Sequence, residues 1–130
     1  MKILVGYDRS SVAKEALKLA KKHAKAFDAK VFILSALAQS NELELVDIQR
    51  AEHEMEYMVT ALKEDNISCE TQAIVSLLPP GEVLVQFAKE NEIDEILIGL
   101  RRKSKVGKLI FGSTAQFVIL NAPCPVVSVK

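Results

Sequence analysis

The sequence predicts an α/β fold with one doubly wound sheet of five parallel strands and helices on both faces. Short apolar runs alternate with stretches of helical periodicity along the 130 residues, and this alternation is typical of βαβ units with right-handed crossovers. Hydrophobic residues make up 49% of the chain and charged residues 26%, which is the balance of a globular protein. Because no repeat, linker or low-complexity segment divides the pattern, we expect a single domain over residues 1–130.

The first strand and the first helix are predicted for residues 3–7 and 11–27. Small polar residues, Asp8 and Ser10 among them, follow the first apolar run and are natural N-caps for a helix. Apolar side chains then recur every three or four positions, opposite a row of lysines, so one face of this helix should lie on the sheet. The apolar positions are Ala13, Ala16, Leu17, Ala20, Ala24 and Phe27.

The next three elements are a strand, a long helix and another strand. Residues 31–37 are apolar apart from Ser35, as expected for a central strand that is covered on both faces. Residues 42–65 keep a rhythm of apolar side chains at spacings of three and four among many acids, which predicts a helix. Residues 69–75 alternate between apolar and polar side chains, so this strand should lie at an edge of the sheet.

Two further pairs of helix and strand complete the pattern. Pro79 and its neighbours open a helix, since proline is tolerated in a first turn, and residues 93–99 form the fourth strand. A short helix over residues 115–119 ends before Pro123, because the residue that precedes a proline disfavours helical geometry. The last strand is predicted for residues 126–129.

Charge, cysteine and histidine content exclude several classes of protein. Seventeen basic and seventeen acidic side chains cancel, so the chain lacks the broad basic surface of a nucleic-acid-binding protein. Two cysteines give no disulfide framework and fit a reducing compartment, and no apolar run approaches the roughly 18 residues of a membrane span. His23 and His53 fall inside predicted helices, remote from any metal-ligand partner. We therefore expect a cytoplasmic protein without a metal site and without nucleic-acid or membrane partners.

The segment from Gly99 to Thr114 is the strongest candidate for a binding site. It joins the fourth strand to the last helix through glycines and hydroxyls, and it contains no acidic residue. In a parallel sheet, ligands bind beyond the carboxyl ends of the strands, where Gly99 and Asp8 both lie. The segment also leads into a helix start with free backbone N–H groups, so it is suited to holding an anion. Its cations are Arg101, Arg102, Lys103, Lys105 and Lys108.

Three separated motifs make the chain resemble the universal stress protein family. Gly99, Arg102 and Gly112 follow the spacing of the family's nucleotide signature, in which G-x-x-G is followed by nine residues and then by G-S or G-T. Residues 3–10 are similar to the family's opening strand with its Asp-Gly-Ser end, and residues 121–129 are similar to its final strand. The resemblance extends over the whole chain.

The resemblance implies a homodimeric, ATP-binding regulatory protein of the stress response, with the sheet order 3-2-1-4-5 of an adenine nucleotide alpha hydrolase-like fold. ATP, with or without Mg²⁺, would lie between the first and fourth strands, its adenine and ribose near Asp8 and its phosphates at the start of the last helix. Family members commonly dimerise through the last strand, here residues 126–129, and an edge strand has unpaired backbone groups to offer. The residues that the resemblance assigns to the nucleotide are Asp8, Ala36, Ile98, Gly99, Arg101, Arg102, Gly112, Ser113 and Thr114.

Two positions depart from the family's pattern. Arg9 stands where the family often has glycine, and Arg102 stands in place of the second glycine of the signature. We expect the cations of the segment to replace part of the backbone contact to phosphate, since a guanidinium binds phosphate through two parallel hydrogen bonds.

Several alternatives stay open at the level of sequence. One is a dimeric interaction module of the same fold that no longer binds nucleotide, and another is an ATP-using enzyme of a related α/β group. We favour a protein that is not an enzyme, because no carboxylate, histidine or metal cluster is placed near the phosphates, although slow hydrolysis and self-phosphorylation stay open. Asp8, Ser113 and Thr114 can also serve simply as helix caps.

Overall fold

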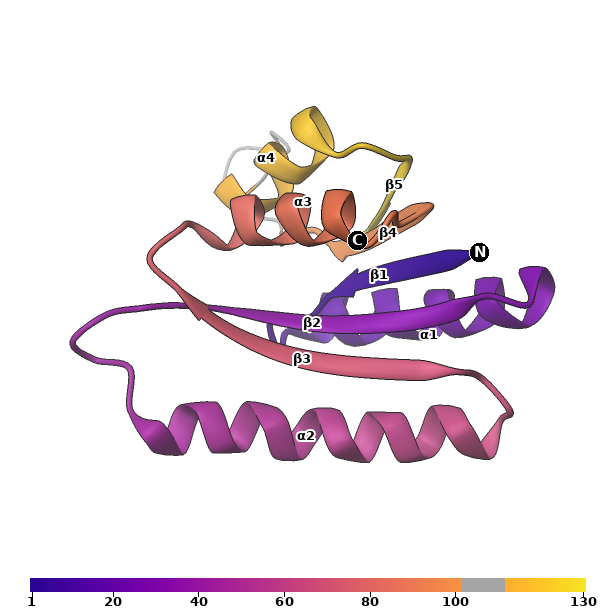
Figure 1. Cartoon of the computed structure of the whole chain (residues 1–130), viewed down its shortest axis with the longest axis horizontal. Coiled ribbons are helices and arrows are strands. Elements are labelled where there is room, and N and C mark those ends of the chain that lie inside the picture. The colour runs from indigo at the N-terminus through magenta and orange to yellow at the C-terminus, as the bar shows by residue number, and fades with distance from the viewer. Residues whose placement is uncertain (102–111) are drawn as a thin grey trace.

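The computed structural model describes residues 1–101 and 112–130, which form one sheet with helices on both of its faces (Figure 1). The elements in chain order are β1 (Lys2–Gly6), α1 (Ser11–Phe27), β2 (Lys30–Ala38), α2 (Leu45–Glu64), β3 (Cys69–Ser76), α3 (Pro80–Glu90), β4 (Glu95–Gly99), α4 (Ser113–Asn121) and β5 (Val126–Val129). All neighbouring strands are parallel, and their order is β3-β2-β1-β4-β5. The predicted fold class and sheet order are confirmed.

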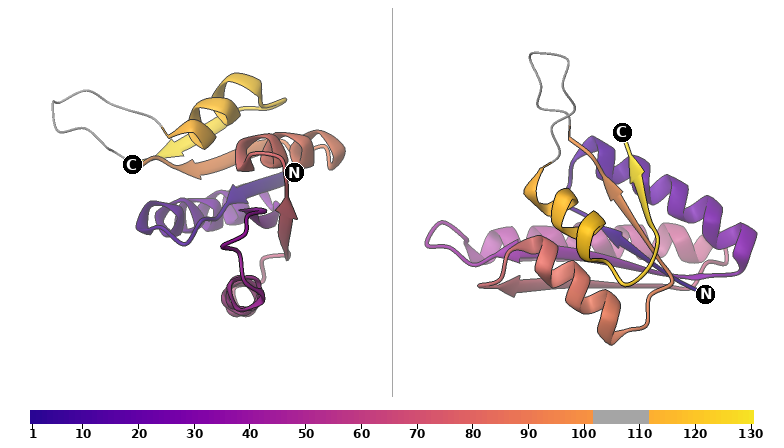
Figure 2. Two further views of the ribbon diagram at one scale, coloured as in Figure 1. Left: turned by 90° about the vertical axis from the view of Figure 1, so that its left-hand side faces the viewer. Right: turned by 90° about the horizontal axis from the view of Figure 1, so that it is seen from above.

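The order of the strands decides which helix covers which face. From β1 the chain adds β2 and then β3 in one direction, so right-handed crossovers place α1 and α2 on the same face. The chain then returns to add β4 and β5 on the other side of β1, which places α3 and α4 on the opposite face, as Figure 2 shows. The direction of winding reverses between β1 and β4, and a crevice opens beyond the carboxyl ends of strands at such a point.

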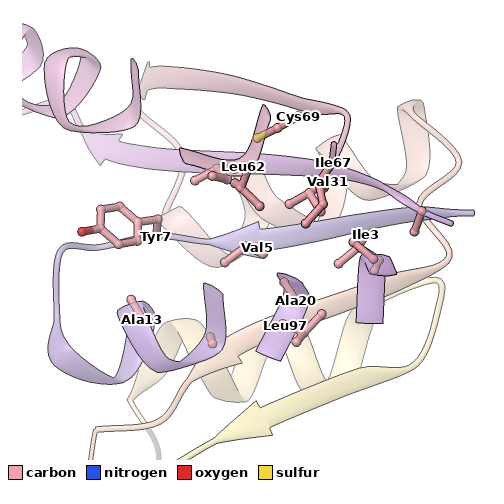
Figure 3. Packing of buried hydrophobic residues seen from close by; sticks show 14 of the residues in the cluster. Ile3, Val5, Tyr7, Ala13, Ala20, Val31, Leu62, Ile67, Cys69 and Leu97 are labelled. Carbon is pink, nitrogen blue, oxygen red and sulfur yellow. The ribbon is translucent and has the colours of Figure 1, made fainter. Parts of the chain in front are cut away.

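Helix α1 lies close to the sheet because its inner face consists of small side chains. It packs on the centre of the sheet, where Ile3 and Val5 of β1 and Leu97 of β4 are fully buried (Figure 3). An alanine face lets the helix backbone approach the strands more closely than a face of leucines would. The buried residues of the helix are Ala13, Ala16, Ala20 and Ala24.

Side-chain caps fix the starts of the first two helices. The hydroxyl of Ser10 accepts a hydrogen bond from the backbone N–H of Ala13 at 3.1 Å, so Ser10 is the N-cap of α1. Helix α2 begins at Leu45, later than the predicted start at residue 42, because its first turn is set by the hydrogen bond from the backbone N–H of Glu44 to the carboxylate of Asp47, at 3.0 Å.

Strands β3 and β5 form the two edges of the sheet. The predicted edge position of β3 is confirmed, and its polar Glu70 and Gln72 are exposed. Val75 is 38% exposed as well, contrary to the predicted alternation. A helix with the length and apolar character needed to span a bilayer is absent from residues 1–101 and 112–130.

Candidate functional site

A cleft of about 400 Å³ opens at the carboxyl ends of β1 and β4, where the winding of the sheet reverses. The cleft brings together residues that lie more than a hundred positions apart in the chain. Eight of the nine residues predicted for the site line it, namely Asp8, Ala36, Ile98, Gly99, Arg101, Gly112, Ser113 and Thr114. Arg102, the ninth, lies outside the described residues, as do Lys103, Lys105 and Lys108.

One half of the cleft is apolar. Ala36 and Leu34 come from β2 and Ile98 from β4, while Leu84 of α3 closes the wall from the other side. Leu34, Leu84 and Ile98 are almost completely buried, so these side chains form a fixed surface against which a flat, weakly polar group can pack. The sequence analysis missed Leu34, although the alternation of side chains along a strand puts it on the same face as Ala36.

The other half of the cleft is formed by the start of α4. Gly112 is the N-cap of this helix, with φ −62° and ψ 157°, and glycine has no side chain that could accept a hydrogen bond from the first turn. The interpretation of Ser113 and Thr114 as simple caps is therefore wrong, because Ser113 is already the first helical residue. The N–H groups of this turn and the two hydroxyls lie at the positive end of the helix dipole.

Gly112 is not crowded by the residues that the structure describes. A Cβ at this position would meet none of their atoms within 4 Å, and the φ angle is one that any residue adopts, so these residues do not require glycine here. The missing side chain leaves room for a ligand at the start of α4.

Gly81 is a residue of the site's framework that the sequence analysis did not identify. A Cβ on Gly81 would lie 3.0 Å from the Cβ of Phe117 and 3.2 Å from the carbonyl oxygen of Thr114. Glycine thus permits the close contact of α3 with α4 that directs the start of α4 into the cleft. The signal in the sequence is the Pro-Pro-Gly run, which predicts a helix start but not this contact.

Gly99 packs against the first turn of α1, and this contact requires glycine. A Cβ on Gly99 would lie 2.6 Å from the carbonyl carbon of Val12 and 2.8 Å from the backbone nitrogen of Ala13. The first turn of α1 therefore fills the space that a side chain would take, and a Cβ here would collide with backbone, not with a ligand. Gly99 still lines the cleft with its main chain.

Asp8 accepts hydrogen bonds at the mouth of the cleft through both of its carboxylate oxygens. Its Oδ1 accepts hydrogen bonds from the backbone N–H of Ser10 at 3.1 Å and from the Ser10 hydroxyl at 2.5 Å. Its Oδ2 accepts from Nη2 of Arg101 at 2.9 Å, and both charged side chains are more than half exposed. The interpretation of Asp8 as the N-cap of α1 is wrong, since Ser10 is the cap, and Asp8 instead links the end of β1 to the residue that follows β4.

Tyr7 and the cysteines have raised pKa values. Burial is the main cause of the raised pKa of the Tyr7 phenol, and the negative charge of Glu54 adds to it. Burial raises the pKa of the Cys69 thiol to about 11, and it also raises the pKa of Cys124. Both cysteines are therefore protonated at neutral pH, which does not suit a nucleophile.

Among residues 1–101 and 112–130, titratable groups suited to metal binding or catalysis do not gather at the cleft. No group of three His, Cys, Asp or Glu side chains that could hold a metal ion occurs in the part of the chain that the structure describes. His23 lies on α1, where its Nδ1 is 2.5 Å from Oε1 of Glu95, and His53 is exposed on α2. Both histidines lie in helices, as the sequence predicts.

Comparisons with known proteins agree with the family resemblance over the full length of the chain. The family model described as Universal stress protein family matches residues 1–130. A universal stress protein of Methanocaldococcus jannaschii is 31% identical over 140 residues, which cover 99% of this chain and 81% of that protein. The solved structure of a universal stress protein from Archaeoglobus fulgidus is 30% identical and superposes with a TM-score of 0.85, over 100% of this chain and 93% of that one. A second solved structure, of the universal stress protein from Archaeoglobus fulgidus in complex with dAMP, is 28% identical with a TM-score of 0.82 and covers 100% of this chain and 98% of that one.

Proposed function

The chain belongs to the universal stress protein family, and we propose that it binds an adenine nucleotide, ATP foremost, as a regulatory protein formed by a single domain over residues 1–130. The observation that carries this proposal is the composition of one cleft, in which an apolar surface faces an uncapped helix start. A nucleotide has the matching halves, a flat base and an anionic phosphate chain.

We assign the base to the apolar half of the cleft. Ala36, Ile98 and Leu84 would contact the adenine, and Asp8 would lie at the ribose. The relative in complex with dAMP supports this choice of base, because dAMP is an adenine nucleotide and that protein has the same fold at 28% identity.

We assign the phosphates to the start of α4. Backbone N–H groups and the hydroxyls of Ser113 and Thr114 would donate to them, with Arg101 at the mouth of the cleft. Any Mg²⁺ would arrive with the nucleotide and be held by its phosphates, since Mg²⁺ commonly keeps several waters and few protein ligands.

Binding is proposed to be the function itself. Asp8 is the carboxylate that lines the described part of the cleft, and it already accepts hydrogen bonds from Ser10 and Arg101, so it is poorly placed to activate a water. We expect turnover of ATP far below the ~1 s⁻¹ of a typical ATP-using enzyme. A rate near that value with the purified protein would instead favour the enzyme alternative.

We further propose that the protein is a homodimer that pairs through β5. The carbonyls of Pro125 and Val129 accept from β4, so in a parallel ladder the N–H groups of Val126 and Ser128 point to the open edge. Such unpaired groups are able to pair with a second copy. The variant Ser128→Pro removes one of these donors without touching the ladder to β4, and light scattering should show a shift from dimer to monomer. A dimer that survives in Ser128→Pro, or a monomeric wild type, would contradict the role of β5.

Calorimetric titration with AMP, ATP and GTP tests the nucleotide proposal. We expect the wild-type protein to bind AMP and ATP and to bind GTP more weakly. In Ser113→Pro the affinity for ATP should fall about tenfold, because proline removes one N–H and one hydroxyl donor to a charged group. Proline is tolerated at the first helical position, and Gly112 before it is extended, with ψ 157°.

Leu45→Pro is the matched control. Leu45 is the first residue of α2 and follows Glu44, whose ψ is also 157°, but it lies outside the cleft. The affinity of the Leu45→Pro protein for ATP should equal that of the wild type. No binding of any nucleotide at millimolar concentration would favour the interaction module that has lost nucleotide.

A further inference from the structure

Arg9 adopts a backbone conformation that side chains disfavour. Its φ angle is 68°, in the left-handed region, where residues with a Cβ are strained and glycine is not. Arg9 follows Asp8 directly and precedes the N-cap Ser10, so the strain lies in the loop that connects β1 with α1 at the mouth of the cleft. A conformation of this kind persists only where neighbouring contacts hold it.

Helix α2 supplies that contact. The guanidinium of Arg9 donates from Nε to Oε2 of Glu54 at 3.0 Å, and its Nη2 lies 2.8 Å from Oε1 of the same carboxylate. Two parallel contacts between planar groups fix the direction of the arginine as well as its distance. Glu54 is itself held in place, because the next residue, Met55, is 2% exposed and anchors α2 on the sheet.

The left-handed turn at Arg9 is what brings Ser10 back to Asp8. Both the N–H and the hydroxyl of Ser10 donate to Oδ1 of Asp8, with one residue between the two partners. If residue 9 left the left-handed region, the peptide that carries the Ser10 N–H would rotate away from Asp8. Asp8 would then be free to leave the position in which it meets Arg101 across the cleft.

We propose that the Arg9–Glu54 ion pair positions Asp8 for the nucleotide, so that α2, which contributes no residue to the cleft, sets the affinity of the site. This inference rests on the proposed function. Arg9 and Glu54 are positioning residues that act through Asp8, and neither needs to touch the nucleotide. Glycine would adopt the left-handed conformation without a partner, whereas Arg9 keeps it through its ion pair with Glu54. The affinity of the cleft therefore depends on α2.

Three variants separate the ion pair from the backbone strain. Arg9→Ala removes the partner and leaves a residue that avoids the left-handed region, so the loop should leave its conformation and the Kd for AMP should rise about tenfold, in line with the ~5- to 30-fold cost of that region for a residue with a Cβ. Arg9→Gly removes the same ion pair but accepts the left-handed region, and it should bind AMP at least three times more tightly than Arg9→Ala. Glu54→Gln should raise the Kd about threefold in the Arg9 protein and should have no effect in the Arg9→Gly background.

Glu70→Gln is the control for loss of a surface ion pair. Glu70 pairs with Lys30 at 3.0 Å on β3 and β2, away from the loop, and its removal should leave the Kd for AMP unchanged. The amide resonances of Asp8 and Ser10, recorded without nucleotide, should shift in Glu54→Gln and stay in place in Glu70→Gln.

Each outcome decides the proposal. A Kd that rises in Arg9→Ala, recovers in Arg9→Gly and rises in Glu54→Gln supports it. Equal Kd values for Arg9→Ala and Arg9→Gly, or an unchanged Kd and unchanged amide shifts in Glu54→Gln while the wild type binds AMP, overturn the positioning role alone. A wild-type protein that binds no AMP overturns the proposed function together with the positioning role.

Discussion

Two hollows lie at opposite ends of the strands, one where the strands begin, called the amino edge below, and one where they end, called the carboxyl edge. The larger of the two is not the one assigned to the nucleotide. The cleft at the carboxyl edge has a volume of about 400 Å³, whereas the hollow at the amino edge has about 570 Å³. The amino-edge hollow lies where β1 and β2 begin and where α1 and α2 end, between Lys2, Lys25, Lys30 and Asp65. The two hollows differ in the helix ends that lie beside them: helices end at the amino edge, and a helix begins at the carboxyl edge.

The carboxyl ends of α1 and α2 lie at the amino edge, where a carbonyl near each helix end accepts a backbone hydrogen bond. The backbone N–H of Ala29 donates to the carbonyl of Ala24, and that of Ile67 donates to the carbonyl of Leu62, each at 3.0 Å. Lys21 forms an ion pair with Asp65 beside this hollow. The carboxyl edge receives the start of α4, whose first-turn N–H groups have no side-chain cap. An anion is therefore expected at the smaller hollow, since oriented donors, and not volume, create a phosphate site.

The largest effect should come from the two glycines of the carboxyl edge, which differ in what a methyl group would meet. We expect Gly99→Ala to lower the free energy of unfolding by about 1–3 kcal/mol, because its Cβ would lie 2.6 Å from backbone of α1. Gly112→Ala should cost about 1 kcal/mol or less, since its Cβ would meet no atom within 4 Å. Urea denaturation of both variants measures the difference, and equal losses would show that α1 does not crowd Gly99.

The next effect sharpens the role of the uncapped helix start. In Gly112→Asp the new carboxylate should accept the first-turn N–H groups of α4, so the free energy of unfolding should rise by a few tenths of a kcal/mol. The same carboxylate would repel phosphate and occupy its donors, so the affinity for ATP should fall about tenfold or more. Calorimetry and urea denaturation on one sample measure both quantities. Gly112→Asn, which caps without charge, is the control and should lose less affinity, and an Asp variant that binds as tightly as the wild type would exclude the start of α4 as the phosphate site.

A smaller effect compares Arg102 of the signature with a cation of the amino-edge hollow. The sequence places Arg102 in the nucleotide signature, so Arg102→Ala should weaken ATP binding about threefold at low salt and less at high salt. Lys25→Ala, at the amino-edge hollow, should leave ATP binding unchanged. Titrations at several salt concentrations measure both. An affinity and a salt dependence that Arg102→Ala leaves unchanged would rule out a contact of Arg102 with phosphate.

The smallest effect concerns the amino edge alone. A hydrogen bond from Lys21 lowers the pKa of the Asp65 carboxyl, so the ionised group stabilises the folded state above the unfolded pKa of about 3.9. This contribution is lost as the pH falls through the lower, folded-state pKa. The wild-type protein should therefore unfold at slightly higher urea than Asp65→Asn at pH 7, and the difference should vanish in acid, while the affinity for ATP stays the same. A stability difference that persists below the folded-state pKa would point to a cause other than this carboxylate.

Much of the fold could be predicted from the sequence because each element has a local pattern. The alanine stripe of α1, the apolar run of β2 and the alternation in β3 all reflect burial, and burial depends on the face that an element turns to the core. The order of the strands and the predicted residues of the cleft came from the resemblance to the universal stress protein family, which rests on three separated motifs.

The contacts that could not be predicted join residues far apart in the chain. The pairing of Arg9 with Glu54 spans 45 residues and that of Asp8 with Arg101 spans 93. Nothing in the local pattern indicated that Gly81 makes room for Phe117, or that Val12 crowds Gly99. Ser10 and Asp8 are both good N-caps, and only the turn at Arg9 decided between them.

Titration of the ¹⁵N-labelled protein with AMP compares the two edges most directly. If the account is right, the amide resonances of Ser113, Thr114 and Ala36 shift with a common saturation curve, while those of Lys25 and Ser68 at the amino-edge hollow stay in place. Shifts confined to the amino edge, or no shift at either edge at millimolar AMP, would contradict the assignment of the nucleotide to the cleft between β1 and β4.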